Sequence, residues 1–311
     1  SMKHYKITTV TVNPALDKST HLRGLVPEQK IRCDAPRYDA GGGGINVSKA
    51  IARLNGESLA LFTAGGPTGE MIKELLIKEG IKVDPITVQN WTRESFVAVD
   101  DNTNSQYRFG FPGAALSEPE KEMILEKVKA IATDYLVLSG SLNDGLPTDF
   151  YKQIAEIAKE SNIKVIVDTS GESLQKVLET NVYLIKPNVG ELAKLVGVDR
   201  LEMEEVNDAA KKIIAQGSAE IIVVSLGPQG AALITKDSYD YVPAPNVAKK
   251  STVGAGDSMV GGMVWALSQN KSLQEVLRWG VACGSAATMN EGTQLFKIED
   301  ANRLFEWLKL K

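Results

Sequence analysis

One carboxylate, Asp257, ends a glycine-rich run in which a helix is predicted to begin. The run is Thr252-Val253-Gly254-Ala255-Gly256-Asp257, and apolar residues then recur at helical spacing at positions 260, 263, 264 and 267. The first amides of a helix have no intrahelical acceptor, and glycine lets an anion approach them closely. A carboxylate there can take a proton from an attacking hydroxyl group. The pattern is therefore typical of phosphoryl transfer, with Asp257 as base and the amides of Gly254, Ala255 and Gly256 holding the transferred group.

Taken alone, the same motif is more common as an aspartate that caps a helix after a turn. Other nucleotide motifs are excluded: the sequence has no G-x-x-x-x-G-K-[ST], and no G-x-G-x-x-G between a strand and a helix with an acidic residue about 20 positions later. A second glycine run, Gly41–Gly44, also precedes a helical pattern. Four consecutive glycines cost backbone entropy without adding to a core, which favours contact with a small ligand.

Alternating strands and helices must position these motifs. We predict strands at 7–12, 59–62, 135–139, 163–168, 182–186 and 220–225, and helices at 45–54, 70–79, 118–132, 148–160, 172–179, 189–197 and 203–216. This order predicts an α/β fold with a mainly parallel central sheet and helices on both faces. Ligands of such sheets bind at the carboxyl ends of strands. Asp17, on the loop after the first strand, and Ser139 and Ser141, at the end of another, are expected there.

The segments near 18–38 and 93–110 do not follow this alternation. Both are β-like and rich in charge, and no helix is predicted within them. We expect them to form a small β-sheet lid on a single domain spanning residues 1–311, because the sequence contains no internal repeat or linker. Apolar residues such as Val97, Phe109 and Phe111 would be exposed on this lid, and a second copy of the chain would bury them.

Composition excludes several classes of protein. Apolar residues make up 43% and charged residues 24% of the chain, as in an ordinary globular protein. The net charge is −4 and no basic stripe is present, so nucleic acid is not an expected partner. Cys33 and Cys283 lie far apart, which argues against a disulfide framework or a zinc site and favours the cytoplasm. Neither a membrane-spanning apolar run nor a signal-peptide pattern is found, so no membrane association is expected.

Four motifs in order resemble the ribokinase-like PfkB sugar kinases, over nearly the whole chain. They are Asn13-Pro14-Ala15-Leu16-Asp17, Gly42-Gly43-Gly44-Ile45-Asn46-Val47, Lys186-Pro187-Asn188-Val189-Gly190-Glu191 and Thr252–Asp257. Within this family the chain is similar to the phosphosugar branch. The 1-phosphofructokinases and tagatose-6-phosphate kinases commonly carry Gly-Gly-Lys-Gly where this chain has Gly41–Gly44. The lysine-free version is similar to the 6-phosphofructokinase type.

The resemblance implies a ribokinase-like fold and the transfer of phosphate from ATP to the C1 hydroxyl of fructose 6-phosphate, a step of glycolysis. Asp17 would accept hydrogen bonds from sugar hydroxyls, as a carboxylate can. The sugar site would also include Gly42, Gly43, Asn46, Ser139 and Ser141. The phosphate already on the sugar would be held by Lys30, Arg32 and Arg93, each of which, taken alone, reads as a solvated surface charge.

On the nucleotide side, the resemblance implies that Asn188 and Glu191 organise Mg²⁺ through water, because magnesium keeps several waters. The same pair also reads as a capping box at a helix start, and both interpretations stay open. The ATP pocket would be lined by Lys186, Asn188, Ser225, Gly227 and Gly230. The last helices, with residues 290–293 between them, would close the adenine side and contribute to a site for a monovalent cation such as K⁺. The family resemblance further implies a homodimer through the lid.

Two alternatives to the expected activity stay open. The first is a close relative, tagatose-6-phosphate kinase or 1-phosphofructokinase. The second is a sensor of sugar phosphate or nucleotide that has no catalytic activity. The intact run from Thr252 to Asp257 argues against a sensor, which does not need a base.

Overall fold

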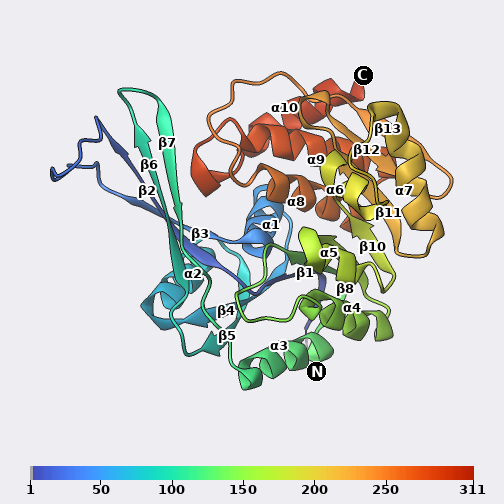
Figure 1. The fold of residues 1–311 in the computed structure, drawn as a ribbon, viewed down its shortest axis with the longest axis horizontal. Helices are drawn as coiled ribbons and strands as arrows, with labels where there is room; N and C mark the ends of the chain where they lie inside the picture. The colour runs from blue at the N-terminus through green and yellow to red at the C-terminus, as the bar shows by residue number, and fades with distance from the viewer. Residues whose placement is uncertain (1–2) are drawn as a thin grey trace.

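A computed structural model describes residues 3–311, and it confirms the predicted α/β architecture with a small additional sheet (Figure 1). Within these residues, a nine-stranded sheet has the order β13-β12-β11-β10-β9-β8-β1-β4-β5 and a four-stranded sheet the order β3-β2-β6-β7. The strands of the large sheet are β1 (His4–Thr11), β4 (Leu59–Gly65), β5 (Lys82–Val88), β8 (Ala132–Ser139), β9 (Lys164–Asp168), β10 (Val182–Ile185), β11 (Ala219–Ser225), β12 (Ala231–Ile234) and β13 (Tyr239–Val242).

Both faces of the large sheet are covered by helices. One face packs against α3 (Glu118–Ala130), α4 (Phe150–Glu160), α5 (Gly171–Val177), α6 (Val189–Leu195) and α7 (Val206–Ala215). The other packs against α1 (Gly43–Arg53), α8 (Ala255–Ser268), α9 (Leu273–Ala287) and α10 (Ile298–Lys309). Alternate residues of one strand enter the two cores: Leu136 and Leu138 face the first set and Val137 the second. Burial on both faces is why these strands have continuous apolar sequences.

The four-stranded sheet, called the lid below, contains β2 (Ala15–Leu22), β3 (Arg37–Gly41), β6 (Arg93–Asp100) and β7 (Ser105–Gly110). It projects from one side of the molecule (Figure 1). The chain follows the expected segments but enters the lid earlier, at Ala15, so Asp17 lies within β2 and not on a loop as predicted. Leu16, the neighbour of Asp17, is buried with α2 (Gly66–Lys78) at the base of the lid.

Several element boundaries differ from the sequence prediction. The residues around Gly66 and Pro67, expected as a loop, are the first turn of α2, where proline is tolerated because its missing N–H has no helical acceptor. The strand β5 was not predicted. It contains Pro85, which suits its place at the end of the sheet, where one side makes no ladder hydrogen bonds. The antiparallel strands β12 and β13 were also missed. Among residues 3–311, none of the helices has the length and apolar character needed to cross a bilayer.

The helices α1 and α8 pack unusually closely, and each starts in one of the two glycine runs. At Gly261 on α8, an added Cβ would lie 2.5 Å from the Cβ of Ala50 and 3.1 Å from the carbonyl oxygen of Val47, both on α1. The contact leaves no room for a methyl group. It therefore fixes how far apart the amino ends of the two helices lie.

We expect Gly261→Ala to separate α1 from α8, lowering stability by roughly 1–3 kcal/mol as overpacking does. The melting temperature in thermal denaturation measures the effect. A matched control is Gly190→Ala in α6, where the nearest atom to the added Cβ is 3.5 Å away, an ordinary contact. Equal melting temperatures for the two variants would contradict the close packing of α1 on α8.

Candidate active site

Asp257 lies in the first turn of α8, where several elements meet. The helix is preceded by Gly254 in the left-handed conformation, with φ 77°. The carboxylate accepts a hydrogen bond from Asn46 Nδ2 at 3.0 Å and one from Ser139 Oγ at 3.4 Å. These donors come from α1 and from the carboxyl end of β8. The structure therefore brings together three residues that the sequence analysis placed in one site.

Burial of its carboxyl group raises the pKa of Asp257 to about 7. The negative charge of Asp168 raises the pKa further, while the hydrogen bond from Asn46, the charge of Lys186 and the hydrogen bond from Ser139 lower it. A general base works best when its pKa is near the operating pH. The environment of Asp257 thus suits proton transfer at neutral pH.

Asp168 is a residue of this site that the sequence analysis missed. It ends β9, and its Oδ1 lies 3.8 Å from Nζ of Lys186, the residue after β10. Burial raises the pKa of Asp168, and the charge of Lys186 acts in the opposite direction. The signal was present in the sequence, because Asp168 directly follows an apolar strand, as Ser139 ends another. Polar residues at strand ends gather at one edge of a parallel sheet.

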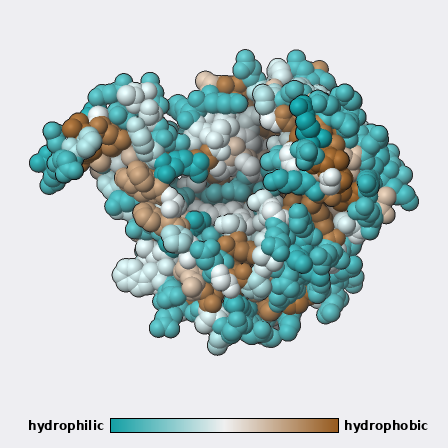
Figure 2. Space-filling view, in the orientation of Figure 1, coloured by the Kyte–Doolittle hydropathy of each residue, from teal (hydrophilic) through white to brown (hydrophobic). Residues whose placement is uncertain are grey.

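Two clefts flank the start of α8, and a space-filling view shows the molecular surface hollowed between the lid and the main body (Figure 2). The first, the helix cleft, has a volume of ≈ 500 Å³ and lies between the ends of β10 and β11 and the helices α8 and α9. It is lined by residues that include Lys186, Ser225, Gly227, Gly230, Thr252, Ala255, Gly256, Ser285 and Thr288. At Gly230 a Cβ would lie 2.0 Å from the Val242 carbonyl oxygen, so only glycine fits there.

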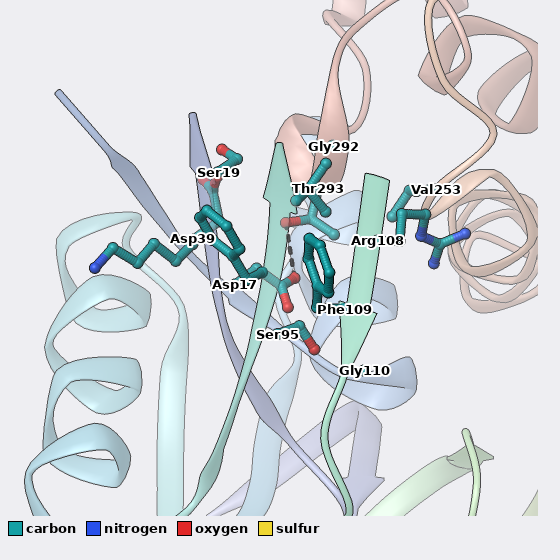
Figure 3. A pocket seen from close by; sticks show the side chains of 13 residues that line it. Asp17, Ser19, Asp39, Ser95, Arg108, Phe109, Gly110, Val253, Gly292 and Thr293 are labelled. Atoms are coloured by element: carbon teal, nitrogen blue, oxygen red, sulfur yellow. Dashed lines mark hydrogen bonds between the residues drawn. The ribbon is translucent and has the colours of Figure 1, made fainter. Parts of the chain in front are cut away.

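The second, the lid cleft, has a volume of ≈ 280 Å³ and lies between the lid and the loop after α9. Figure 3 shows Asp17 pointing to Thr293, whose hydroxyl donates a hydrogen bond to Asp17 Oδ2 at 3.1 Å. Burial raises the pKa of Asp17 to about 6, while the Thr293 hydrogen bond and the charge of Lys49 lower it. Arg108 of β7 also lines this cleft, opposite Val253. The sequence analysis had not assigned Arg108 a role.

Comparisons with known proteins agree with this arrangement. Residues 10–301 match the pfkB family carbohydrate kinases. The chain belongs to the pfkB family of carbohydrate kinases. It is 43% identical over 305 residues to the ATP-dependent 6-phosphofructokinase isozyme 2 of Escherichia coli (strain K12), covering 97% of this chain and 99% of that protein.

Two further pfkB relatives bear on the substrate. The 1-phosphofructokinase of Bacillus subtilis (strain 168) is 35% identical over 293 residues, which cover 93% of this chain and 95% of that protein. The crystal structure of the Escherichia coli phosphofructokinase-2 in complex with fructose-6-phosphate superposes with a TM-score of 0.92 at 41% identity, covering 98% of this chain and 99% of that chain. The fold of this pfkB kinase is therefore the ribokinase-like fold that the sequence predicted.

The Gly41–Gly44 run of this pfkB kinase is required by packing. A Cβ at Gly43 would lie 2.5 Å from the carbonyl carbon of Ser139, and one at Gly41 would lie 2.1 Å from Asp17 Oδ2. Gly42 has φ 113°, a conformation that other residues rarely adopt. The glycines thus let α1 begin against the end of β8 and beside Asp17. A sugar contact by Gly42 and Gly43 stays a prediction.

The three predicted phosphate-binding cations lie in different places. Arg93, at the start of β6, donates to the carbonyls of Asn13 at 3.3 Å and of Phe111 at 3.4 Å. Lys30 and Arg32 are exposed on the loop between β2 and β3, and neither lines the helix cleft or the lid cleft. Ser141 is exposed and accepts a hydrogen bond from Asn13 Nδ2 at 3.1 Å.

Asn188 and Glu191 form the capping box that their spacing predicts. The Asn188 side chain accepts a hydrogen bond from the Glu191 amide at 2.8 Å, and the Glu191 side chain accepts one from the Asn188 amide at 3.1 Å. No group of three or more Asp, Glu, His or Cys residues able to hold a metal occurs among residues 3–311. The negative charge of Glu191 contributes to the raised pKa of Asp168, so the two carboxylates lie near each other. These few oxygen donors fit Mg²⁺, which is held mainly by water and phosphate oxygens.

The structure refines two details of the site. The amide of Ala255 donates to the Thr252 carbonyl at 3.2 Å, so Gly256 is the better-placed amide donor for a phosphoryl group. The last helices were expected to close the adenine side, and the helix cleft is lined by residues of α9 and the segment after it: Val281, Gly284, Ser285 and Thr288. Gly292 and Thr293, between α9 and α10, line the lid cleft.

The lid contacts the main body at its outer end through His21 of β2. One ring nitrogen of His21 lies 2.7 Å from Asp101 Oδ1 on the lid, and the other 3.0 Å from Glu291 Oε2 on the loop after α9. Hydrogen bonds to these two carboxylates raise the pKa of His21. The contact closes the lid over its cleft.

We expect Asp257→Asn to raise the melting temperature at pH 8. The carboxyl of Asp257 has a pKa of about 7 when folded and an ordinary value of 3.8 when unfolded, so the folded state binds the proton more tightly. The free energy of unfolding of the wild type therefore falls as the pH rises from about 4 to 7 and stays low above that range. The neutral amide avoids this loss.

Thermal denaturation between pH 4 and pH 8 measures the difference, which should be largest at pH 8 and should shrink toward pH 4. The matched control is Asp144→Asn, which changes an exposed carboxylate in the same way. If both variants show the same pH dependence as the wild type, the carboxyl of Asp257 does not have the raised pKa.

Proposed function

We propose that this chain catalyses ATP-dependent phosphorylation of fructose 6-phosphate at the C1 hydroxyl, giving fructose 1,6-bisphosphate and ADP. The observation that carries the proposal is the place of Asp257 in the first turn of α8. Its neighbour Gly256 lines a cleft with the size and glycine lining of a nucleotide site, and Val253, just before the helix, lines the cleft with the acceptor Asp17. The name of the Escherichia coli relative and the fructose-6-phosphate complex of the similar structure support the sugar phosphate.

In the proposed reaction, ATP binds in the helix cleft and the sugar phosphate in the lid cleft. Asp257 accepts the proton of the C1 hydroxyl as that oxygen forms a bond to the γ-phosphorus, and the bond from the γ-phosphorus to the β–γ bridging oxygen breaks to release ADP. Lys186 and the free amide at Gly256 stabilise the developing charge. Bound Mg²⁺ would neutralise charge on the phosphates, held through water by Asn188, Glu191 and Asp168.

Asn46 and Ser139 keep the proton acceptor oriented. Both side chains donate hydrogen bonds to the carboxylate of Asp257 and hold it in one orientation. In this orientation the carboxylate accepts the proton of the C1 hydroxyl. Asp17 lies on the lid side of the lid cleft, across from Val253, and binds sugar hydroxyls there. Arg93 and Arg108, both on the lid, supply positive charge for the phosphate on the sugar.

We further propose that the chain forms a homodimer through the lid. Aromatic side chains are left exposed there, with Phe109 49% and Phe111 53% accessible. Lys30 and Arg32 lie on the outer loop of the same lid, where a partner brought against it would come within their reach. They would then contribute to phosphate binding only across the interface. A K⁺ requirement stays a prediction of the family resemblance, and the two unpaired cysteines fit action in the cytoplasm.

Two closely related activities are the main competitors. The chain is also similar to a 1-phosphofructokinase, at lower identity. The absence of lysine at Gly43 favours fructose 6-phosphate, because the 1-phosphofructokinases and tagatose-6-phosphate kinases commonly carry lysine at this position. A sensor without activity does not explain why a carboxyl with a pKa of about 7 lies between the clefts.

The deciding experiment is a coupled assay of ADP release with fructose 6-phosphate, fructose 1-phosphate and tagatose 6-phosphate. We expect the highest kcat/KM with fructose 6-phosphate. Asp257→Asn should lower turnover by several orders of magnitude and leave nucleotide binding intact, because the amide cannot accept the proton. A higher kcat/KM with another sugar phosphate would overturn the substrate assignment, and near-normal turnover of the variant would overturn the role of Asp257.

The dimer is tested by light scattering at micromolar concentration. We expect the wild type to have twice the mass of one chain, and Phe109→Asp to shift the mass toward that of the monomer, because a charge would be buried in the interface. The matched control is Tyr239→Asp, which changes an exposed aromatic residue on β13, away from the lid. A monomeric wild type would contradict the proposal.

A further inference from the structure

Lys49 is a buried charge that the proposed reaction does not use. It lies on α1, is 1% exposed and is among the largest fully buried side chains of the described residues. Its ammonium donates to the carbonyl oxygens of Ala40 at 2.9 Å and Thr293 at 2.8 Å. A buried ammonium is costly unless its N–H groups have acceptors. Lys49 has such acceptors, and its ammonium thereby joins the two segments that carry them.

The two acceptors lie on either side of Asp17. Ala40 belongs to β3, which pairs with β2 so that Leu16 lies opposite Ala40 and Asp17 opposite Asp39. Thr293 belongs to the loop after α9, and its hydroxyl is the donor to Asp17 Oδ2 (Figure 3). One lysine thus connects the strand beside Asp17 to the residue that hydrogen-bonds its carboxylate. Because Lys49 lies on α1, this helix joins β3 to the loop after α9.

We propose that Lys49 is a positioning residue for Asp17, which holds the Thr293 hydroxyl against the lid and thereby fixes the carboxylate in the orientation that binds the sugar. The proposal rests on the proposed role of Asp17 in the lid cleft. Lys49 follows Asn46 by three residues on α1, and Asn46 donates to Asp257. The single helix α1 therefore orients both carboxylates, one for the sugar and one for the proton.

The charge of Lys49 acts in the same direction as its hydrogen bonds. Burial lowers the pKa of Lys49, while the nearby carboxylates of Glu79, Asp39 and Asp17 raise it and Arg53 lowers it. In return, Lys49 favours the ionised form of Asp17. An ionised carboxylate is the form that accepts hydrogen bonds from sugar hydroxyls. Loss of the lysine would remove both the tether and the charge.

The test compares Lys49→Met with Lys49→Arg. Methionine has a similar side-chain length but neither hydrogen-bond donors nor charge. Arginine keeps the donors and the positive charge. We expect Lys49→Met to raise KM for the sugar phosphate roughly tenfold, as for loss of one interaction with a charged group. The KM for ATP should change less than about twofold, because Lys49 does not line the helix cleft. The KM of Lys49→Arg for the sugar phosphate should be close to that of the wild type.

A second pair of variants does not depend on the buried lysine. Thr293→Val removes the hydroxyl and should raise the sugar KM alone, whereas Thr293→Ser keeps the hydroxyl and should not. The double variant Lys49→Met with Thr293→Val should be little worse than the worse single variant, since both act through one contact. If Lys49→Met does not fold, a sugar KM of Thr293→Val equal to that of the wild type overturns the proposal by itself.

Three other results would overturn the proposal: equal rises in both KM values, additive effects in the double variant, and no recovery with arginine. The wild-type assay with three sugar phosphates is run first, and the Lys49 comparison uses the one that is turned over. A wrong substrate assignment therefore leaves this test intact. If none is turned over, the proposed function fails, and the shift in melting temperature with fructose 6-phosphate replaces KM, with a smaller shift for Lys49→Met than for Lys49→Arg expected.

Discussion

The site depends on the hydrogen bond from Asn46 to Asp257, because it joins the amino ends of two helices that start in glycine runs. A carboxylate placed between packed elements loses solvation, and this loss raises its pKa to about 7. The donors Asn46 and Ser139 limit that rise without cancelling it. The close packing of α1 on α8 at Gly261 keeps the donor in reach. The packing of α1 on α8 therefore sets both the position of Asp257 and its raised pKa.

The glycines serve this constraint in two ways. In the first run, Gly41 and Gly43 allow backbone to lie against Asp17 and against the end of β8, where any side chain would collide. In the second, Gly254 adopts the left-handed conformation that starts α8. The argument from entropy alone favoured a ligand contact for the first run. The structure shows that Gly43 lies close to the backbone of Ser139 and Gly41 close to the Asp17 carboxylate, and these contacts account for the two glycines.

The lid is tied to the body by charged and polar side chains at three depths. Lys49 holds the base of β3, Thr293 contacts Asp17 in the cleft, and His21 contacts Glu291 at the outer end. All three contacts involve the end of β3, the strand β2 or the loop after α9. The loop after α9 therefore contacts the lid at two points, through Glu291 and Thr293. This loop directly follows α9, which lines the helix cleft.

The sequence by itself determined the alternating fold and the helix start at Asp257, because strand and helix periodicity are local patterns. Strand-end polarity predicted Asp17 and Ser139 as site residues, and the resemblance to the PfkB sugar kinases implied Asn46 and Lys186. Only the tertiary structure decided that Arg108 lines the lid cleft, that Thr293 and Lys49 hold Asp17, and that Lys30 and Arg32 lie outside both clefts. It also decided that Asp168, at the end of a predicted strand, acts on Asp257. The strands β5, β12 and β13 depended on it as well. The reason is physical: burial, charge coupling and contacts such as Asp17–Thr293 join residues far apart in the chain, and no local spacing encodes them.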